Sequence, residues 1–149
     1  MILKRKITGF TLVELITVMI IVGILAAFAA PRFFDTNIFQ SRGFADEVKA
    51  TLRFAQKTAV AQRKFVCVAF TVTAITLTYG STAACGSDLT SPTGVTPYVI
   101  KSPNNDITLS GGANFSFNAL GRPSFAAQQN ITVTDSAPIV IEVETGYVH

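Results

Sequence analysis

Few side chains in this sequence could perform covalent or acid–base catalysis. The chain has a single histidine, His149, and two cysteines, Cys67 and Cys85, which is too small a set for a His-based triad or a zinc site. Glu142 and Glu144 alternate along an expected strand and would share one face, where carboxylates are usually solvated. We therefore expect no enzyme active site, no bound cofactor and no metal.

The chemistry that the sequence does support centres on one carboxylate. Glu14 is the only charged residue in the apolar run from Phe10 to Ala30, which as a helix of roughly 31 Å would match the ~30 Å hydrocarbon core of a bilayer. A carboxylate there costs a few kcal/mol unless it is paired or extends to the headgroups. A cut between Gly9 and Phe10 would create an α-amine one helical turn from Glu14, and the two charges could pair within or between chains.

Three interpretations of this N-terminus follow from the residues. A secretory signal would use the basic start and the Ala27-Phe28-Ala29 sequence, although the apolar run exceeds the roughly 7–15 residues of a usual signal. A second interpretation is a membrane anchor that is never cut. The third is a short leader, residues 1–9, that is removed on the cytoplasmic side of the apolar run. The third gives Glu14 a partner for its charge.

Residues 6–15, K-I-T-G-F-T-L-V-E-L, resemble the type IV prepilin signature. In that signature a glycine precedes the cut, an aromatic residue begins the mature chain, and glutamate is its fifth residue. The resemblance implies that a prepilin peptidase cleaves between Gly9 and Phe10 and methylates Phe10, and that Glu14 guides assembly. It also implies three kinds of partner: other pilin subunits, the peptidase and the inner-membrane pilus assembly machinery.

The charge distribution predicts the location of the chain. Lys4, Arg5 and Lys6 precede the apolar run, and positive residues beside a spanning segment stay in the cytoplasm. Without these three of the twelve basic residues, nine would face nine acidic ones, which does not suit a general nucleic-acid binder. The charges therefore predict that the chain from Pro31 onward lies across the membrane, in a periplasm if the cell has one. The resemblance to prepilins implies a single-pass inner-membrane protein with a periplasmic C-terminal domain, which becomes extracellular when it assembles into a pilus.

An amphipathic continuation of the helix is predicted for residues 31–64. Pro31 allows the helix to continue with a kink, and apolar residues then recur every three or four positions, with one gap at Ser41. Weak helix formers at 35–37 and at Gly43 mark an expected soft point.

Beyond residue 64 the pattern changes to short strands. β-branched and aromatic residues predict a hairpin of Phe65–Thr73 and Ile75–Tyr79, connected at Ala74. Residues 80–97, rich in Gly, Ser, Thr and Pro, predict a loop. Further strands are expected at 98–101, 107–109, 115–118, 131–134 and 139–144. The expected fold class is α+β and pilin-like: a long N-terminal helix packed on an antiparallel β domain that spans residues 65–149.

Cys67 lies in the first expected strand and Cys85 in the loop. On the oxidising side of a membrane a disulfide between them would persist, and closing this loop would stabilise the fold by about 3 kcal/mol. Two separate thiols are the alternative.

Further sequence segments resemble particular groups within the type IV pilin-like proteins. Residues 115–123, which end in Gly-Arg-Pro, and residues 144–148, E-T-G-Y-V, resemble the GspH/FimT group of minor pilins and pseudopilins. Residues 32–35, 41–44 and 54–63 resemble the MshC-type minor pilins of the MSHA pilus. This implies a low-abundance subunit that initiates or caps a type IV pilus. The alternatives are a type II secretion minor pseudopilin and a DNA-binding minor pilin of natural transformation.

Four basic residues are candidate contacts to other subunits or to DNA. Lys49, Arg53 and Lys57 recur every four positions on the polar face of the amphipathic helix. The fourth residue, Arg122, lies in the β domain. The helix residues are either a solvated surface or contacts to acidic residues of neighbouring subunits. DNA-binding FimT-like pilins use a Gly-Arg-x-Arg motif, of which Gly121-Arg122-Pro123-Ser124 retains only the first arginine, and this disfavours DNA binding.

Overall fold

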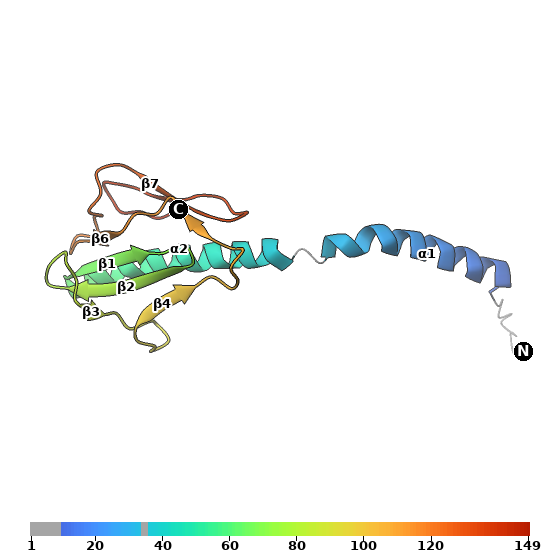
Figure 1. The fold of residues 1–149 in the computed structure, drawn as a ribbon, viewed down its shortest axis with the longest axis horizontal. Coiled ribbons are helices and arrows are strands. Elements are labelled where there is room, and N and C mark those ends of the chain that lie inside the picture. Colours follow the sequence, from blue (N-terminus) through green and yellow to red (C-terminus); the bar gives the residue numbers. More distant parts are fainter. Residues whose placement is uncertain (1–9, 34–35) are drawn as a thin grey trace, which may run out of the picture. The chain divides into compact units, whose positions relative to one another are not determined.

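The computed structural model describes residues 10–33 and 36–149. The expected leader, its cleavage site at Gly9 and Asp35 of the expected soft point lie outside the described residues. The chain divides into two compact units, residues 1–36 and residues 37–149 (Figure 1). The first unit holds helix α1, Leu12–Phe33, which continues through Pro31 as predicted.

Helix α2, Thr36–Gln62, supplies the central element of the second unit. The predicted apolar stripe is buried in the core, with exposures of 6% or less for Ala45, Val48, Leu52, Ala55 and Ala59. Ser41 fills the gap in this stripe: its side chain is fully buried, and its hydroxyl has no hydrogen-bond partner among the described residues. The helix runs unbroken through Gly43, where the sequence predicted a soft point, and packing of the buried stripe stabilises it there.

The C-terminus of α2 is closed by a Schellman motif. Arg63, with φ of 51°, occupies the left-handed position that glycine usually takes. The Lys64 N–H donates to the Ala59 carbonyl at 3.2 Å and the Arg63 N–H donates to the Val60 carbonyl at 3.3 Å. These bonds satisfy the last carbonyls of the helix and turn the chain into the first strand.

The first sheet is antiparallel and contains β1 (Phe65–Phe70), β2 (Ala74–Gly80), β3 (Ser87–Asp88), β4 (Tyr98–Lys101) and β6 (Phe115–Phe117). Strand β1 lies between β2 and β6, and both β3 and β4 pair with β2. The predicted hairpin of the first two strands is confirmed. Its connection is not at Ala74, however, because Ala74 already pairs with Lys101. The expected loop 80–97 contains the short strand β3, which pairs antiparallel with β2.

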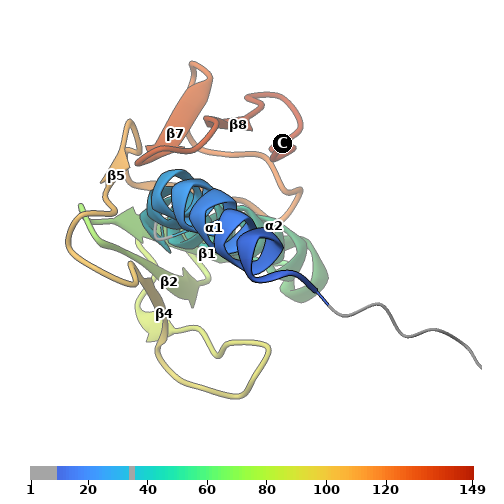
Figure 2. The same ribbon diagram turned by 90° about the vertical axis from the view of Figure 1, so that its right-hand side faces the viewer.

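The second sheet is antiparallel and contains β5 (Leu109–Ser110), β7 (Gln129–Val133) and β8 (Ile139–Ile141), in the order β5-β7-β8. Figure 2 shows β1, β2 and β4 on one side of α2, and β7 and β8 on another. Strand β8 is shorter than the expected 139–144, because the chain turns back after it and Val148 bridges to Ile141. The predicted α+β class, with helix first and antiparallel strands after it, is confirmed.

Candidate functional site

The N-terminal end of α1 places Glu14 in the first turn of the helix. Thr11 precedes the helix as its N-cap, and its Oγ1 accepts a hydrogen bond from the Glu14 N–H at 3.2 Å. Glu14 therefore occupies the third helical position after the Thr11 cap, in a Thr-x-x-Glu sequence typical of a capping box. This cap was not predicted from the sequence, although the Thr-x-x-Glu spacing signals it.

The surface of α1 is apolar and open. Every described side chain from Phe10 to Ala27 is exposed, and Phe10 itself is 75% exposed. Contiguous apolar surface of this extent marks an interaction with a membrane or with another protein. Among residues 10–33 and 36–149, no helix combines the length and the apolar character that crossing a membrane requires.

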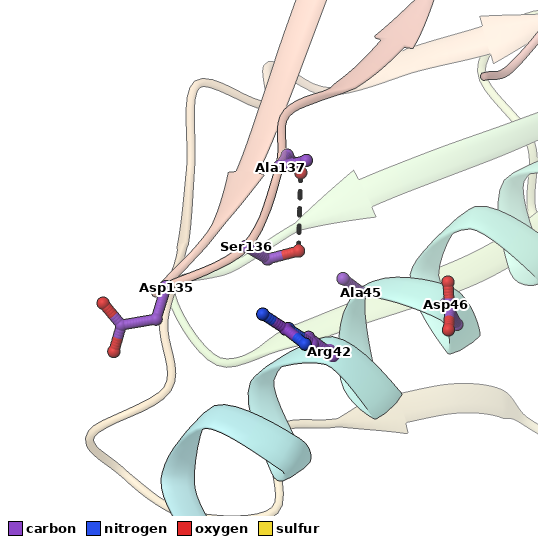
Figure 3. A pocket seen from close by; sticks show the side chains of 6 residues that line it. All are labelled: Arg42, Ala45, Asp46, Asp135, Ser136 and Ala137. Atoms are coloured by element: carbon purple, nitrogen blue, oxygen red, sulfur yellow. Dashed lines mark hydrogen bonds between the residues drawn. The ribbon is translucent and has the colours of Figure 1, made fainter.

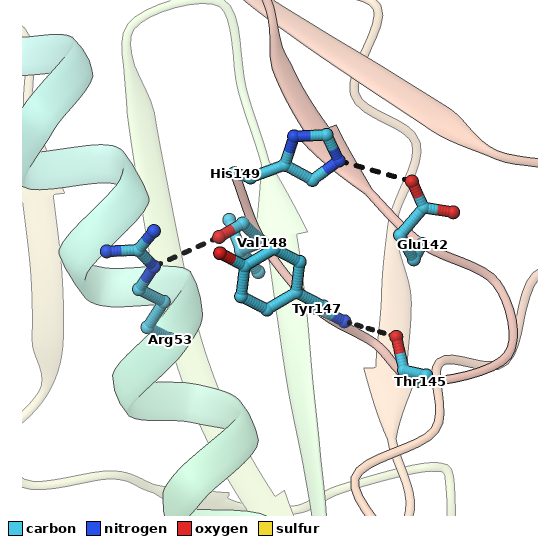
Figure 4. A network of polar contacts seen from close by, with 6 residues as sticks. All are labelled: Arg53, Glu142, Thr145, Tyr147, Val148 and His149. Carbon is cyan, nitrogen blue, oxygen red and sulfur yellow. Dashed lines mark hydrogen bonds and ion pairs between the residues drawn. The ribbon is translucent and has the colours of Figure 1, made fainter.

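The four candidate basic residues differ in burial and in their contacts. Lys49 is half-buried and Lys57 is exposed. Arg53 is not simply solvated, because its Nε donates to the Val148 carbonyl at 3.0 Å and ties α2 to the C-terminal segment (Figure 4). Arg122 forms an ion pair with Glu144, in which both side chains are at least half exposed. Two of the four cations therefore already have partners within the domain.

The two sequence segments that resemble GspH/FimT proteins meet in space. Gln56 of α2 uses its Nε2 to donate to the Gly121 carbonyl at 3.1 Å and to the Thr145 carbonyl at 2.7 Å. Gly146 packs so closely here that a Cβ would lie 2.2 Å from the Gly121 carbonyl oxygen. One helix side chain thus joins the turn after β6 to the C-terminal segment, a contact that the sequence did not predict.

The acidic pair of the C-terminal segment is also placed differently from expectation. Glu142 and Glu144 do not alternate on one strand face, because β8 ends at Ile141 and Glu144 lies in the following turn. Glu142 instead contacts the His149 ring at 3.1 Å, as Figure 4 shows, whereas Glu144 contacts Arg122. Each of these acids therefore contacts a basic side chain of its own domain.

A shallow pocket of about 360 Å³ lies between α2 and the turn that joins β7 to β8 (Figure 3). Its lining includes Arg42 and Asp46 from the helix and Asp135 and Ser136 from the turn. Figure 3 shows the Asp135 carboxylate directed away from the other lining residues. In the described part of the chain, no three His, Cys, Asp or Glu side chains are grouped as a metal site would need.

The structure joins Cys67 and Cys85 by a disulfide, with Cα atoms 6.1 Å apart. This bond links β1 to the segment before β3 and closes a separation of 18 residues. The predicted bridge is therefore present, and the alternative of two separate thiols is not what the structure contains.

Removing this disulfide should lower the stability of the folded protein by about 3 kcal/mol, because the unfolded chain regains the entropy of the closed loop. Replacing Cys67 and Cys85 together by alanine should shift the denaturant midpoint accordingly. Thiol alkylation of the exported wild-type protein, unfolded without reductant, should label neither cysteine. Full labelling of both would show that the bridge does not form in the cell.

Comparison with known proteins gives three findings. Residues 4–30 match the family described as the prokaryotic N-terminal methylation motif. Over 56 residues the chain is 43% identical to the type IV narrow pilus major component PilA5 of Thermus thermophilus, a match that covers 38% of this chain and 48% of that protein. The chain thus spans about half the length of this curated relative.

The third finding concerns the fold. The type IV minor pilin FimU of Pseudomonas aeruginosa (strain PAO1) superimposes with a TM-score of 0.56 over 76% of this chain and 90% of its own, at 15% sequence identity. The fold is pilin-like. The chain therefore combines an N-terminal methylation motif with a pilin-like domain.

Proposed function

We propose that this chain is a minor pilin subunit that co-assembles through its N-terminal helix into a type IV pilus of the MSHA kind, where it initiates or caps the filament. The observation that carries the proposal is the methylation motif at residues 4–30, which overlaps the exposed apolar helix α1, together with the pilin-like domain that follows in the sequence. No enzymatic activity or cofactor is part of this function.

The geometry of the N-terminus supports an assembly mechanism. A prepilin peptidase cuts after Gly9 and methylates Phe10, which leaves a charged amine at the start of α1. The Thr11 cap holds Glu14 in the first turn of that helix. In a bundle of apolar helices, an unpaired carboxylate or amine is expensive, so that pairing of the two favours the correct register between subunits.

Before assembly, we propose that residues 10–30 hold the chain in the inner membrane and that the domain lies in the periplasm. The basic residues of the leader support this orientation, because positive charges are retained on the cytoplasmic side. The inner-membrane assembly machinery then transfers the chain from the bilayer to a filament with other pilin subunits.

Two alternative functions are a DNA-binding minor pilin and a type II secretion pseudopilin. A DNA-binding role is weakened by the ion pair of Arg122 with Glu144, which leaves one cation fewer for phosphate groups. A type II secretion pseudopilin would have the same fold. Deletion of the gene distinguishes the roles, since loss of pili, of protein secretion or of DNA uptake each selects one.

Processing of the chain tests the proposal. Mass spectrometry of protein from the native membrane should find a chain that begins at Phe10 and carries a methyl group on its amine. Replacing Gly9 by leucine should leave the leader attached, and deletion of the peptidase should do the same in the wild type. A mature chain that begins after Ala29 or Ala30 would instead identify a secretory signal and contradict the proposed function.

A further inference from the structure

A second pocket of the domain lies between the C-terminal half of α2 and the strands β2 and β3. Its volume of about 440 Å³ is within the range of roughly 300–1,000 Å³ that is usual for small-molecule sites. Phe54 and Thr58 line it from the helix, and Tyr79 and Leu89 line it from the strand side. Tyr79 belongs to the sheet face that packs on the helix, because it lies two residues after the buried Leu77. We call this hollow the α2–β2 pocket.

Two aromatic rings give the α2–β2 pocket an apolar surface. Phe54 and Tyr79 are both half-buried, and both pack against the hydrophobic core. The ammonium of the exposed Lys64 lies 5.0 Å from the centroid of the Tyr79 ring. A contact of this kind at an exposed site contributes only about 0.5–1 kcal/mol, so a ligand can replace it. The ring face of Tyr79 therefore suits a group with a partial positive charge, such as the C–H bonds of a sugar ring.

The Thr58 side chain adds an unsatisfied hydrogen-bonding group to the pocket. Thr58 is only 9% exposed, and its hydroxyl forms no hydrogen bond with the residues that the structure describes. The other buried threonine of α2 differs, because the Thr51 hydroxyl lies 3.1 Å from the Tyr98 hydroxyl and bonds to it. A buried polar group without a partner costs about 1–3 kcal/mol. A hydroxyl of a bound ligand would remove that cost.

The charges of the pocket exclude several classes of ligand. Its lining contains one basic residue, Lys64, and one acidic residue, Asp88, which cancel. A polyanion such as a nucleic acid needs several cations in one place. A purely apolar ligand would cover Thr58 and Gln62 without giving them hydrogen-bond partners. The ligand that fits is uncharged, with an apolar face for the aromatic rings and hydroxyl groups for the polar ones.

We propose that the α2–β2 pocket binds a neutral saccharide. One sugar ring stacks on Tyr79 in place of the Lys64 ammonium, and its hydroxyl groups bond to the Thr58 hydroxyl and to the Gln62 amide. This inference goes beyond the proposed function, since assembly into a filament requires no such ligand.

Titration of the full-length chain with cellotriose and with maltotriose, followed by saturation-transfer NMR, tests the proposal. The detergent that holds the chain in solution must carry no sugar headgroup. At least one of the two sugars should bind with a Kd of about 1 mM or tighter. Tyr79→Leu should weaken binding at least about tenfold, because it removes the stacking ring. Tyr147→Leu is the matched control, since that ring is 56% exposed and lies outside the pocket lining, and it should leave the affinity unchanged.

A second variant keeps the test valid if Tyr79→Leu disturbs the fold. Thr58→Val preserves the shape of the side chain and removes only the hydroxyl, so it should weaken binding several-fold while the denaturant midpoint does not fall. Binding of neither sugar, or binding that Tyr79→Leu and Thr58→Val leave unchanged, would overturn the proposal. Incorporation of Thr58→Val into filaments should equal that of the wild type, which separates this result from a failure of the proposed function.

Discussion

Replacing Glu14 by glutamine should reduce incorporation of the chain into filaments by tenfold or more, while membrane association is retained. Glutamine preserves the shape of the side chain and can serve in a capping box as glutamate does, but it removes the charge that would pair with the Phe10 amine. Breaking one side of a buried ion pair costs about 3–5 kcal/mol, which accounts for so large a loss. The measurement is the amount of subunit in sheared filaments relative to membranes.

The Thr11 cap of the same helix turn provides the control. Thr11→Ala removes the hydrogen bond from the Glu14 N–H to the Thr11 Oγ1 and should cost only about 1 kcal/mol of helix stability, with modest effects on incorporation. If Glu14→Gln assembles normally and Thr11→Ala does not, then assembly depends on the Thr11 cap and not on the charge of Glu14, and the pairing mechanism is wrong.

Replacing Gly146 by alanine should destabilise the second unit by at least about 3 kcal/mol. Gly146 has φ of 67°, and its added Cβ would lie 2.2 Å from the Gly121 carbonyl oxygen and 2.8 Å from the Gln56 Nε2. The substitution therefore combines a strained backbone with a clash against the contact that joins α2, the turn after β6 and the C-terminal segment. Denaturant unfolding of the purified chain measures the loss.

Gly94 offers a matched control for this substitution. It also has positive φ, 86°, but a Cβ there would meet nothing within 4 Å. Gly94→Ala should therefore cost only the backbone strain, about 1–2 kcal/mol. Equal losses for the two variants would mean that the close contact of Gly146 with Gly121 does not contribute to stability.

Much of the architecture could be predicted because it depends on local patterns. The buried stripe of α2 follows from the spacing of its apolar residues, and the β1–β2 hairpin follows from β-branched residues on both sides of a short turn. Strand β3 was missed because two residues are too few to show alternation. The length of β8 was overestimated because the alternating pattern continues past Ile141 into a turn.

The sequence by itself predicted the chemistry of the N-terminus, because its four residues, Gly9, Phe10, Thr11 and Glu14, lie between positions 9 and 14 and the motif needs no distant partner. Only the tertiary structure decided the roles of Arg53, Gln56 and Arg122. Arg53 and its acceptor Val148 are 95 positions apart, and Gln56 and Gly121 are 65 apart. Such pairs form when the return of the chain brings the C-terminal segment against α2, and no local periodicity encodes that approach. For the same reason a basic stripe on a helix did not reveal which of its cations already have a partner.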